Sequence, residues 1–131
     1  MKDFYHNRPF MAALAALYAI AALVMGVQAG EPSSIIWWAV AFPFLAWVAS
    51  PVVVGLSLSR FMSRKLTRAI FVAAVVAIGL YGFLDQWHVM FIGPSDAQNA
   101  LVMIFDPMLQ WVAVGLVFFI ASFAERYVLK S

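Results

Sequence analysis

The side chains that can do chemistry gather in the last third of the chain. Asp85 and His88 are three positions apart, and Asp106 and Gln110 are four apart, so each pair shares a face if its segment is helical. Asp96 lies between the two pairs. Carboxyl and imidazole groups in one place can hold a proton or a cation. A metal site is not favoured, because the ligands are few and match no known spacing.

No other pattern predicts catalysis or a cofactor. The chain has no cysteine and two histidines, which excludes thiolate metal sites and cysteine nucleophiles. We find no glycine-rich phosphate loop and no HExxH motif. The formal charge of +2 is too small to predict a nucleic-acid partner. We therefore expect a non-enzymatic protein without a cofactor.

The elements that position these residues are predicted from hydropathy. Apolar residues make up 66% of the chain and the mean hydropathy is +0.95, more apolar surface than a small soluble domain can bury. Four apolar runs are each long enough to cross a bilayer, and backbone in lipid must be helical to pair its polar groups. The sequence predicts an all-α membrane protein in which residues 1–131 form a single four-helix bundle, with helices at about 9–29, 35–58, 69–91 and 97–124.

The basic residues predict the orientation of the helices. All eight fall at one side of the predicted membrane: Lys2, Arg8, Arg60, Arg64, Lys65, Arg68, Arg126 and Lys130. The positive-inside rule makes that side cytoplasmic, so both termini are expected inside (N-in and C-in). The loop with Arg60, Arg64, Lys65 and Arg68 is a topology signal, and it is also suited to anionic lipid headgroups.

The depth of Asp106 decides how it is interpreted. Counting back about 20 residues from the end of helix four places Asp106 near the outer interface. Asp106 followed by Pro107 favours a helix start, which would make residues 97–105 a separate interfacial or re-entrant piece. The alternative is one helix bent at Pro107. We expect helix four to be bent or broken at Asp106–Pro107.

The polar residues at this depth have two interpretations. Asp85, His88, Asp96, Asp106 and Gln110 would form an outer acidic cluster without a lysine or arginine. One interpretation is a solvated loop with a helix cap, because shallow acids cost little. The other is a site for a cation or proton, or a face for a cationic partner. No ionisable residue lies in the middle of a predicted helix, which weakens the transporter hypothesis.

Small residues predict where helices approach closely. They form stripes on the first and third helices, and we select as a packing interface Ala12, Ala16, Ala19, Gly26, Ala73 and Ala77. These stripes suit internal packing and equally a membrane-protein partner or a second copy of the chain.

The segment "SDAQNALVMIFDPMLQWVAVGL" (residues 95–116) resembles a segment of small four-helix bacterial inner-membrane proteins, some of which are immunity proteins of membrane-acting toxins. Asp106 stands where that segment usually has an apolar residue. The resemblance implies a multi-pass protein of the bacterial inner membrane that binds a toxin without catalysis. Two alternatives stay open: a cation- or proton-coupled transporter or channel that uses Asp85 and Asp106, and an accessory subunit of a larger membrane complex.

Overall fold

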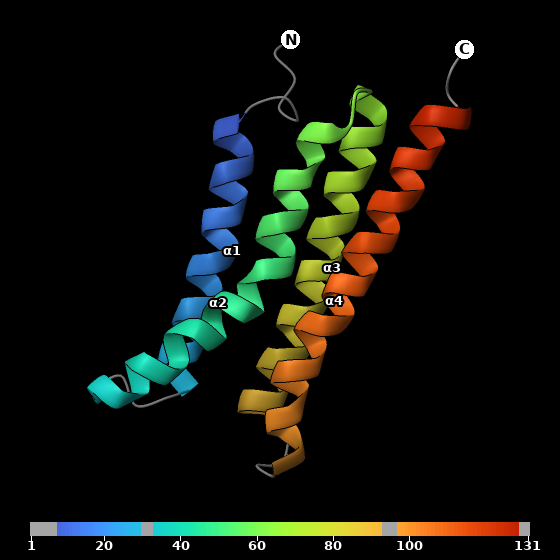
Figure 1. Cartoon of the computed structure of the whole chain (residues 1–131). Helices are drawn as coiled ribbons and strands as arrows, with labels where there is room; N and C mark the ends of the chain where they lie inside the picture. The colour runs from blue at the N-terminus through green and yellow to red at the C-terminus, as the bar shows by residue number, and fades with distance from the viewer. Residues whose placement is uncertain (1–7, 30–32, 93–96, 129–131) are drawn as a thin grey trace.

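The chain folds into four long helices. The computed structural model describes residues 8–29, 33–92 and 97–128, and no strand occurs among them. Each helix is long and apolar enough to cross a membrane. The predicted all-α architecture with four helices of membrane-spanning length is therefore confirmed. The helices are α1 (Arg8–Ala29), α2 (Ile35–Leu58), α3 (Lys65–Phe91) and α4 (Ala97–Phe123) (Figure 1).

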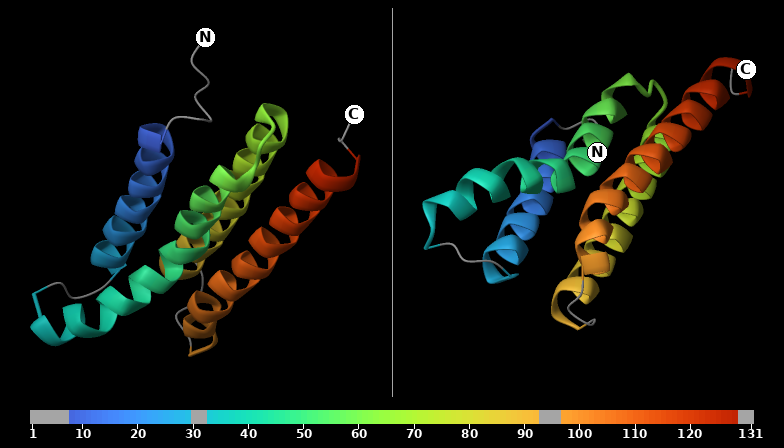
Figure 2. Two further views of the ribbon diagram at one scale, coloured as in Figure 1. Left: turned by 45° about the horizontal axis from the view of Figure 1, so that its top comes forward. Right: turned by 60° about the horizontal axis from the view of Figure 1, so that its bottom comes forward.

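The helices pack as two neighbouring pairs, α1 with α2 and α3 with α4, and α2 also packs against α4. Figures 1 and 2 show α3 and α4 side by side, with the C-terminal half of α2 against them, while the N-terminal half of α2 bends away beside α1. The main apolar core lies where α2, α3 and α4 meet. Its buried residues are Val52, Leu56, Met62, Phe71, Val72, Val75 and Val114.

The bend in α2 has a local chemical cause. Pro43 and Pro51 lie inside the helix, and a proline gives no N–H to the carbonyl four residues earlier. For Pro51 that carbonyl belongs to Trp47, and the Ser50 hydroxyl donates to it at 2.7 Å. The Trp111 indole of α4 donates to the same Ser50 oxygen at 3.0 Å. Ser50 therefore replaces the missing donor and joins α2 to α4.

Helix α3 begins at Lys65, earlier than the apolar run predicts. The cause lies on another helix: α4 ends in a π-helical turn, Ala124–Val128, from which the Glu125 carboxylate accepts from the backbone N–H groups of Ser63 at 3.0 Å and Arg64 at 2.8 Å. A carboxylate at a helix N-terminus satisfies free N–H groups and complements the helix dipole. Polar residues can therefore form the first turn of α3.

Helix α4 contradicts the broken alternative at Asp106–Pro107, whereas a bend there stays a prediction. The helix runs without interruption from Ala97 to Phe123, with Pro107 inside it, so Asp106 is not a helix start and residues 97–105 are not a separate piece. Tertiary contacts support this stretch, because Pro107 is buried and the Trp47 indole of α2 donates to the Ile104 carbonyl at 3.3 Å.

Candidate functional site

Helices α3 and α4 approach closely at a glycine. A Cβ on Gly82 of α3 would lie 1.7 Å from Nε2 of Gln110 on α4, so only glycine leaves room for this amide. Gln110 is 5% exposed, and its Nε2 donates to the Ile78 carbonyl at 3.3 Å. The Tyr18 hydroxyl of α1 donates to the Gly79 carbonyl at 3.3 Å and lies within interaction range of Gln110. The Gln110 amide thus lies where three helices meet.

Two carboxyl groups lie beside this amide. Asp106 precedes Gln110 by one helical turn, and the Asp106 and Asp85 side chains interact across α3 and α4. The Oδ2 atom of Asp106 and the Oε1 atom of Gln110 are buried without a hydrogen-bond partner in the described chain. A buried acceptor without a donor costs about 1–3 kcal/mol, and more if it is charged. These two oxygen atoms therefore favour a ligand that is cationic or donates hydrogen bonds.

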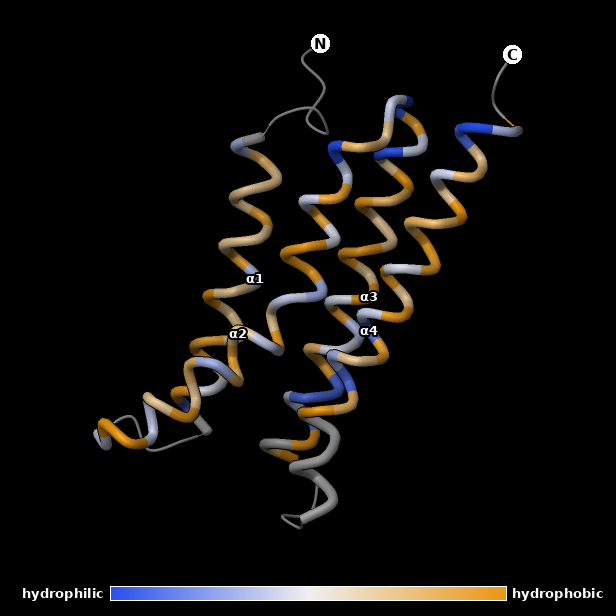
Figure 3. The backbone as a smooth tube through the Cα atoms, in the orientation of Figure 1, coloured by the Kyte–Doolittle hydropathy of each residue, from blue (hydrophilic) through white to orange (hydrophobic). Residues whose placement is uncertain are grey.

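The basic residues of the described chain lie far from this site. Arg68 precedes Asp85 by 17 residues on α3, and Arg126 follows Asp106 by 20 residues along α4, which is roughly 26 Å and 30 Å at 1.5 Å per residue. Figure 3 shows a hydrophilic zone where α3 and α4 meet, separate from the hydrophilic end of the bundle. The negative charge of Asp85 and Asp106 is therefore not offset by a neighbouring lysine or arginine of the described chain.

A groove between α3 and α4 is lined by the two residues that carry these oxygen atoms, Asp106 and Gln110. Its volume is about 400 Å³. Asp106 and Gln110 supply the acidic and amide groups of the lining, and Tyr81, which is 78% exposed, supplies an aromatic ring. The rest of the lining is small or apolar: Ala77, Ile78, Gly82, Leu109 and Ala113. The groove is an apolar trough with a polar zone.

A second amide continues the same face of α3. Gln86 is completely buried, and neither its Nε2 nor its Oε1 has a hydrogen-bond partner in the described chain. It follows Gly79 and Gly82 at spacings of seven and four residues, which places all three on one side of the helix. The interior face of α3 therefore carries a second buried amide that has no hydrogen-bond partner in the described chain and lies outside the groove lining.

The remaining predicted cluster residues are dispersed. His88 is exposed on α3, and Asp96 lies outside the described residues. The structure therefore brings together Asp85, Asp106 and Gln110 from the predicted set. Among the described residues, no group of three or more His, Cys, Asp or Glu side chains could hold a metal ion.

The predicted basic loop divides into exposed and buried residues. Arg60, Arg64 and Lys65 are exposed, as headgroup contact requires. Arg68 is 7% exposed, and its guanidinium donates to the carbonyls of Ser59, at 3.0 Å, and Met62. Arg68 therefore holds the loop between α2 and α3 together from inside.

The predicted small-residue interface also divides. Gly26 packs against α2, where an added Cβ would lie 2.7 Å from Leu45, and Ala19 is partly buried. The other four face outward: Ala12 and Ala16 of α1 and Ala73 and Ala77 of α3. Internal packing thus accounts for part of the stripes only.

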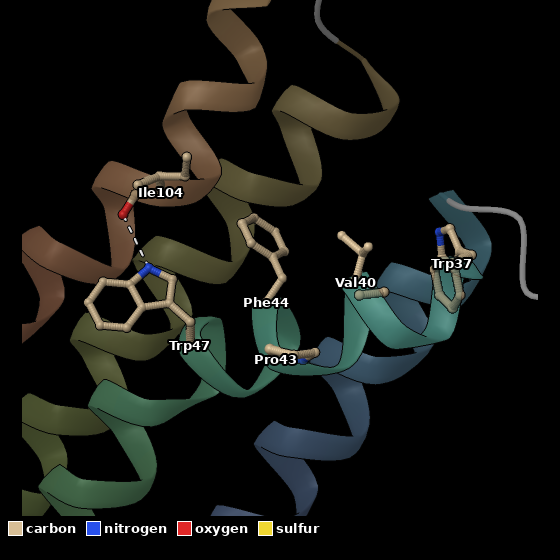
Figure 4. A pocket seen from close by; sticks show the side chains of 7 residues that line it. Trp37, Val40, Pro43, Phe44, Trp47 and Ile104 are labelled. Carbon is tan, nitrogen blue, oxygen red and sulfur yellow. Dashed lines mark hydrogen bonds between the residues drawn. The ribbon is translucent and has the colours of Figure 1, made fainter. Parts of the chain in front are cut away.

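A second groove lies between the bent half of α2 and the start of α4. Its volume is about 570 Å³. Figure 4 shows Trp37, Val40, Phe44 and Trp47 along it, with the Trp47 indole bonded to the Ile104 carbonyl. Its lining contains no ionisable side chain. The described lining of this groove is apolar and aromatic, which suits apolar groups.

Two residues of the site, Tyr18 and Gly82, were not predicted from the sequence. Tyr18 is a polar group in the middle of an apolar helix, which is a usable signal. Gly82 gives no such signal, because its importance depends on which α4 residue faces it. Away from the site, the cap that Glu125 forms on α3 also depends on a tertiary contact. Comparisons of the chain with models of protein families, with curated proteins and with solved structures find no match, so the resemblance to immunity proteins stays a prediction.

Proposed function

We propose that this protein is a multi-pass membrane protein that binds a cation between α3 and α4 and carries it across the bilayer. The observation that supports the proposal most is the pair of buried, unpartnered oxygen atoms, Asp106 Oδ2 and Gln110 Oε1, in a groove. The neighbouring Asp85 carboxyl group interacts with that of Asp106. Ionisable residues within membrane helices are costly, and they commonly serve binding or transport.

The proposed setting is the bacterial inner membrane with both termini in the cytoplasm. The segment that joins α2 to α3 lies at the same end of the bundle as the start of α1 and the end of α4 (Figure 1), and it carries Arg60, Arg64 and Lys65. The positive-inside rule places that end in the cytoplasm. The groove then opens in the outer half of the membrane, within reach of external cations.

Ion flux through purified protein in liposomes tests the proposal. We expect an imposed gradient of a monovalent cation, inorganic or organic, to drive flux above that of empty liposomes. The Asp106→Asn variant should lose at least tenfold of this flux, because it removes the charge and keeps the shape. Glu125→Gln is the matched control: it removes one carboxylate at the opposite end of α4 and keeps an oxygen for the α3 cap. Wild-type flux in Asp106→Asn would refute the proposal.

The outward alanines support a second candidate, a protein that binds a membrane partner. Ala73 and Ala77 of α3 are exposed beside the groove, and a Cβ on Gly115 of α4 would meet no atom within 4 Å. Small residues let a further helix approach. The partner would be a membrane-acting toxin, if the chain is an immunity or inhibitor protein, or a subunit of a larger complex.

Site-specific crosslinking tests the partner-binding hypothesis separately from the transport proposal. A photoreactive residue at Ala73 should capture one stoichiometric partner, whereas the same residue at Ile36, which is exposed on α2 outside the small-residue stripes, should not. For the immunity reading, cells that lack the protein should die only when the toxin is present. Survival of those cells with the toxin would eliminate that reading.

A further inference from the structure

The size and lining of the α3–α4 groove indicate which class of cation it takes. Its volume of about 400 Å³ far exceeds the roughly 30 Å³ that one water molecule occupies in the liquid. Ala77, Ile78, Leu109 and Ala113 supply apolar surface next to the acidic group. An occupant that fills the groove must therefore carry an apolar body as well as a charge.

A bare metal ion does not suit this lining. Calcium takes six to eight oxygen ligands and magnesium demands six in near-ideal geometry. The groove offers the unpartnered Oδ2 of Asp106 and the unpartnered Oε1 of Gln110. A small ion would lack ligands and leave the apolar walls without contact.

We infer that the groove binds an organic ammonium ion that has an apolar body and at least one N–H group. This inference rests on the proposed cation-binding function and specifies its substrate class. The ammonium charge lies against the Asp106 carboxylate, its N–H donates to Gln110 Oε1, and its apolar body lies along Ala77, Leu109 and Ala113. The exposed ring of Tyr81 adds a π face that attracts cations.

The N–H requirement follows from Gln110. Its Nε2 is already used on the Ile78 carbonyl, and the amide is fixed by Gly82, so Oε1 is presented as an acceptor. A quaternary ammonium has the same charge and no hydrogen to donate. A site built to hydrogen-bond a ligand group rejects the analogue that lacks it. We therefore expect binding weaker by about tenfold for the quaternary analogue, the effect of roughly one hydrogen bond.

Calorimetric titration of the full chain in lipid nanodiscs tests this inference with 2-naphthylmethylammonium and its N,N,N-trimethyl analogue. Wild type should bind the first about tenfold more tightly. Gln110→Leu should remove this preference while binding of the trimethyl analogue remains, because only the acceptor is lost. Asp106→Asn should weaken both ligands at least tenfold. Equal binding of both ligands by wild type would overturn the assignment of Gln110.

A second pair of variants keeps the test decisive if Gln110→Leu does not fold. Ala113→Leu fills the groove and should abolish binding of both ligands, whereas Gly115→Leu adds the same side chain on α4 outside the groove lining and should bind as wild type does. Undiminished binding in Ala113→Leu would exclude the groove as the site.

Flux of inorganic cations without binding of either ammonium ligand would overturn this inference and leave the proposed transport function standing. Ammonium binding without any flux would overturn the proposed transport function and leave this inference standing.

Discussion

Replacing Gly82 by alanine tests the packing that holds Gln110 in place. The new Cβ would lie 1.7 Å from Gln110 Nε2 and 2.7 Å from its Cδ, so the amide must leave its position. It then loses its bond to the Ile78 carbonyl. Forced repacking of this kind costs about 1–3 kcal/mol, and a lost hydrogen bond between membrane helices costs about 0.6 kcal/mol on average.

One gain opposes these losses. Alanine in a helix interior is more favourable than glycine by about 1 kcal/mol. Gly115→Ala is the matched control on α4, because its Cβ would meet no atom within 4 Å, and it carries the gain alone. We therefore expect Gly82→Ala to be less stable than Gly115→Ala by about 1.5–3.5 kcal/mol, the sum of the repacking and hydrogen-bond costs.

The assay is reversible unfolding in mixed micelles as the fraction of denaturing detergent rises, followed by circular dichroism. A double-mutant cycle with Gln110→Ala isolates the contact, since Gly82→Ala should cost much less once the amide is gone. Equal stability of Gly82→Ala and Gly115→Ala, or the same cost of Gly82→Ala with and without Gln110, would refute the packing at this site.

Three further predictions use the same chain. Ser50→Ala should lower the free energy of unfolding by about 1–3 kcal/mol, because it leaves both a backbone carbonyl and an indole N–H without partners. Ser57→Ala should change it little, because the Ser57 hydroxyl donates to a carbonyl within an intact helical turn. Equal effects of the two substitutions in the micelle assay would contradict this prediction. Glu125→Ala should lower the free energy of unfolding by about 1 kcal/mol, the usual effect of losing a helix cap. An unchanged free energy in the same assay would show that Glu125 does not stabilise α3. Because the natural chain has no cysteine, an impermeant maleimide should label Ser33→Cys in intact cells and Arg60→Cys only after permeabilisation, and the opposite pattern would invert the topology.

The helices are predictable from sequence because each is a long apolar run between polar residues. Their ends are less predictable. Helix α3 begins at Lys65 because a carboxylate from α4, distant in sequence, caps it. Helix α4 continues through Pro107 although Asp–Pro is a good helix start. The proline is buried in the bundle, and the Trp47 indole of α2 donates to the Ile104 carbonyl, three residues before the proline. Local propensity does not include these tertiary contacts.

The candidate site is predictable in part, for the same reason. Helical spacing and the antiparallel pairing of the last two helices indicate that Asp85, Asp106 and Gln110 converge, and the structure brings them together. The burial of Gln110 and the role of Gly82 depend on the register between α3 and α4, which hydropathy does not set. His88 shares a face of α3 with Asp85 by its spacing and yet is exposed, because burial depends on where α4 covers that face.

The most direct test of the central claim is cation-protected labelling of Asp106. Dicyclohexylcarbodiimide reacts with carboxyl groups in apolar surroundings, and peptide mass spectrometry identifies the modified residue. The proposed site predicts modification of Asp106 that 2-naphthylmethylammonium slows in proportion to its occupancy, with no such protection in Ala113→Leu. Modification of Asp106 at the same rate with and without the ammonium ion would contradict the claim that this carboxyl group holds the cation.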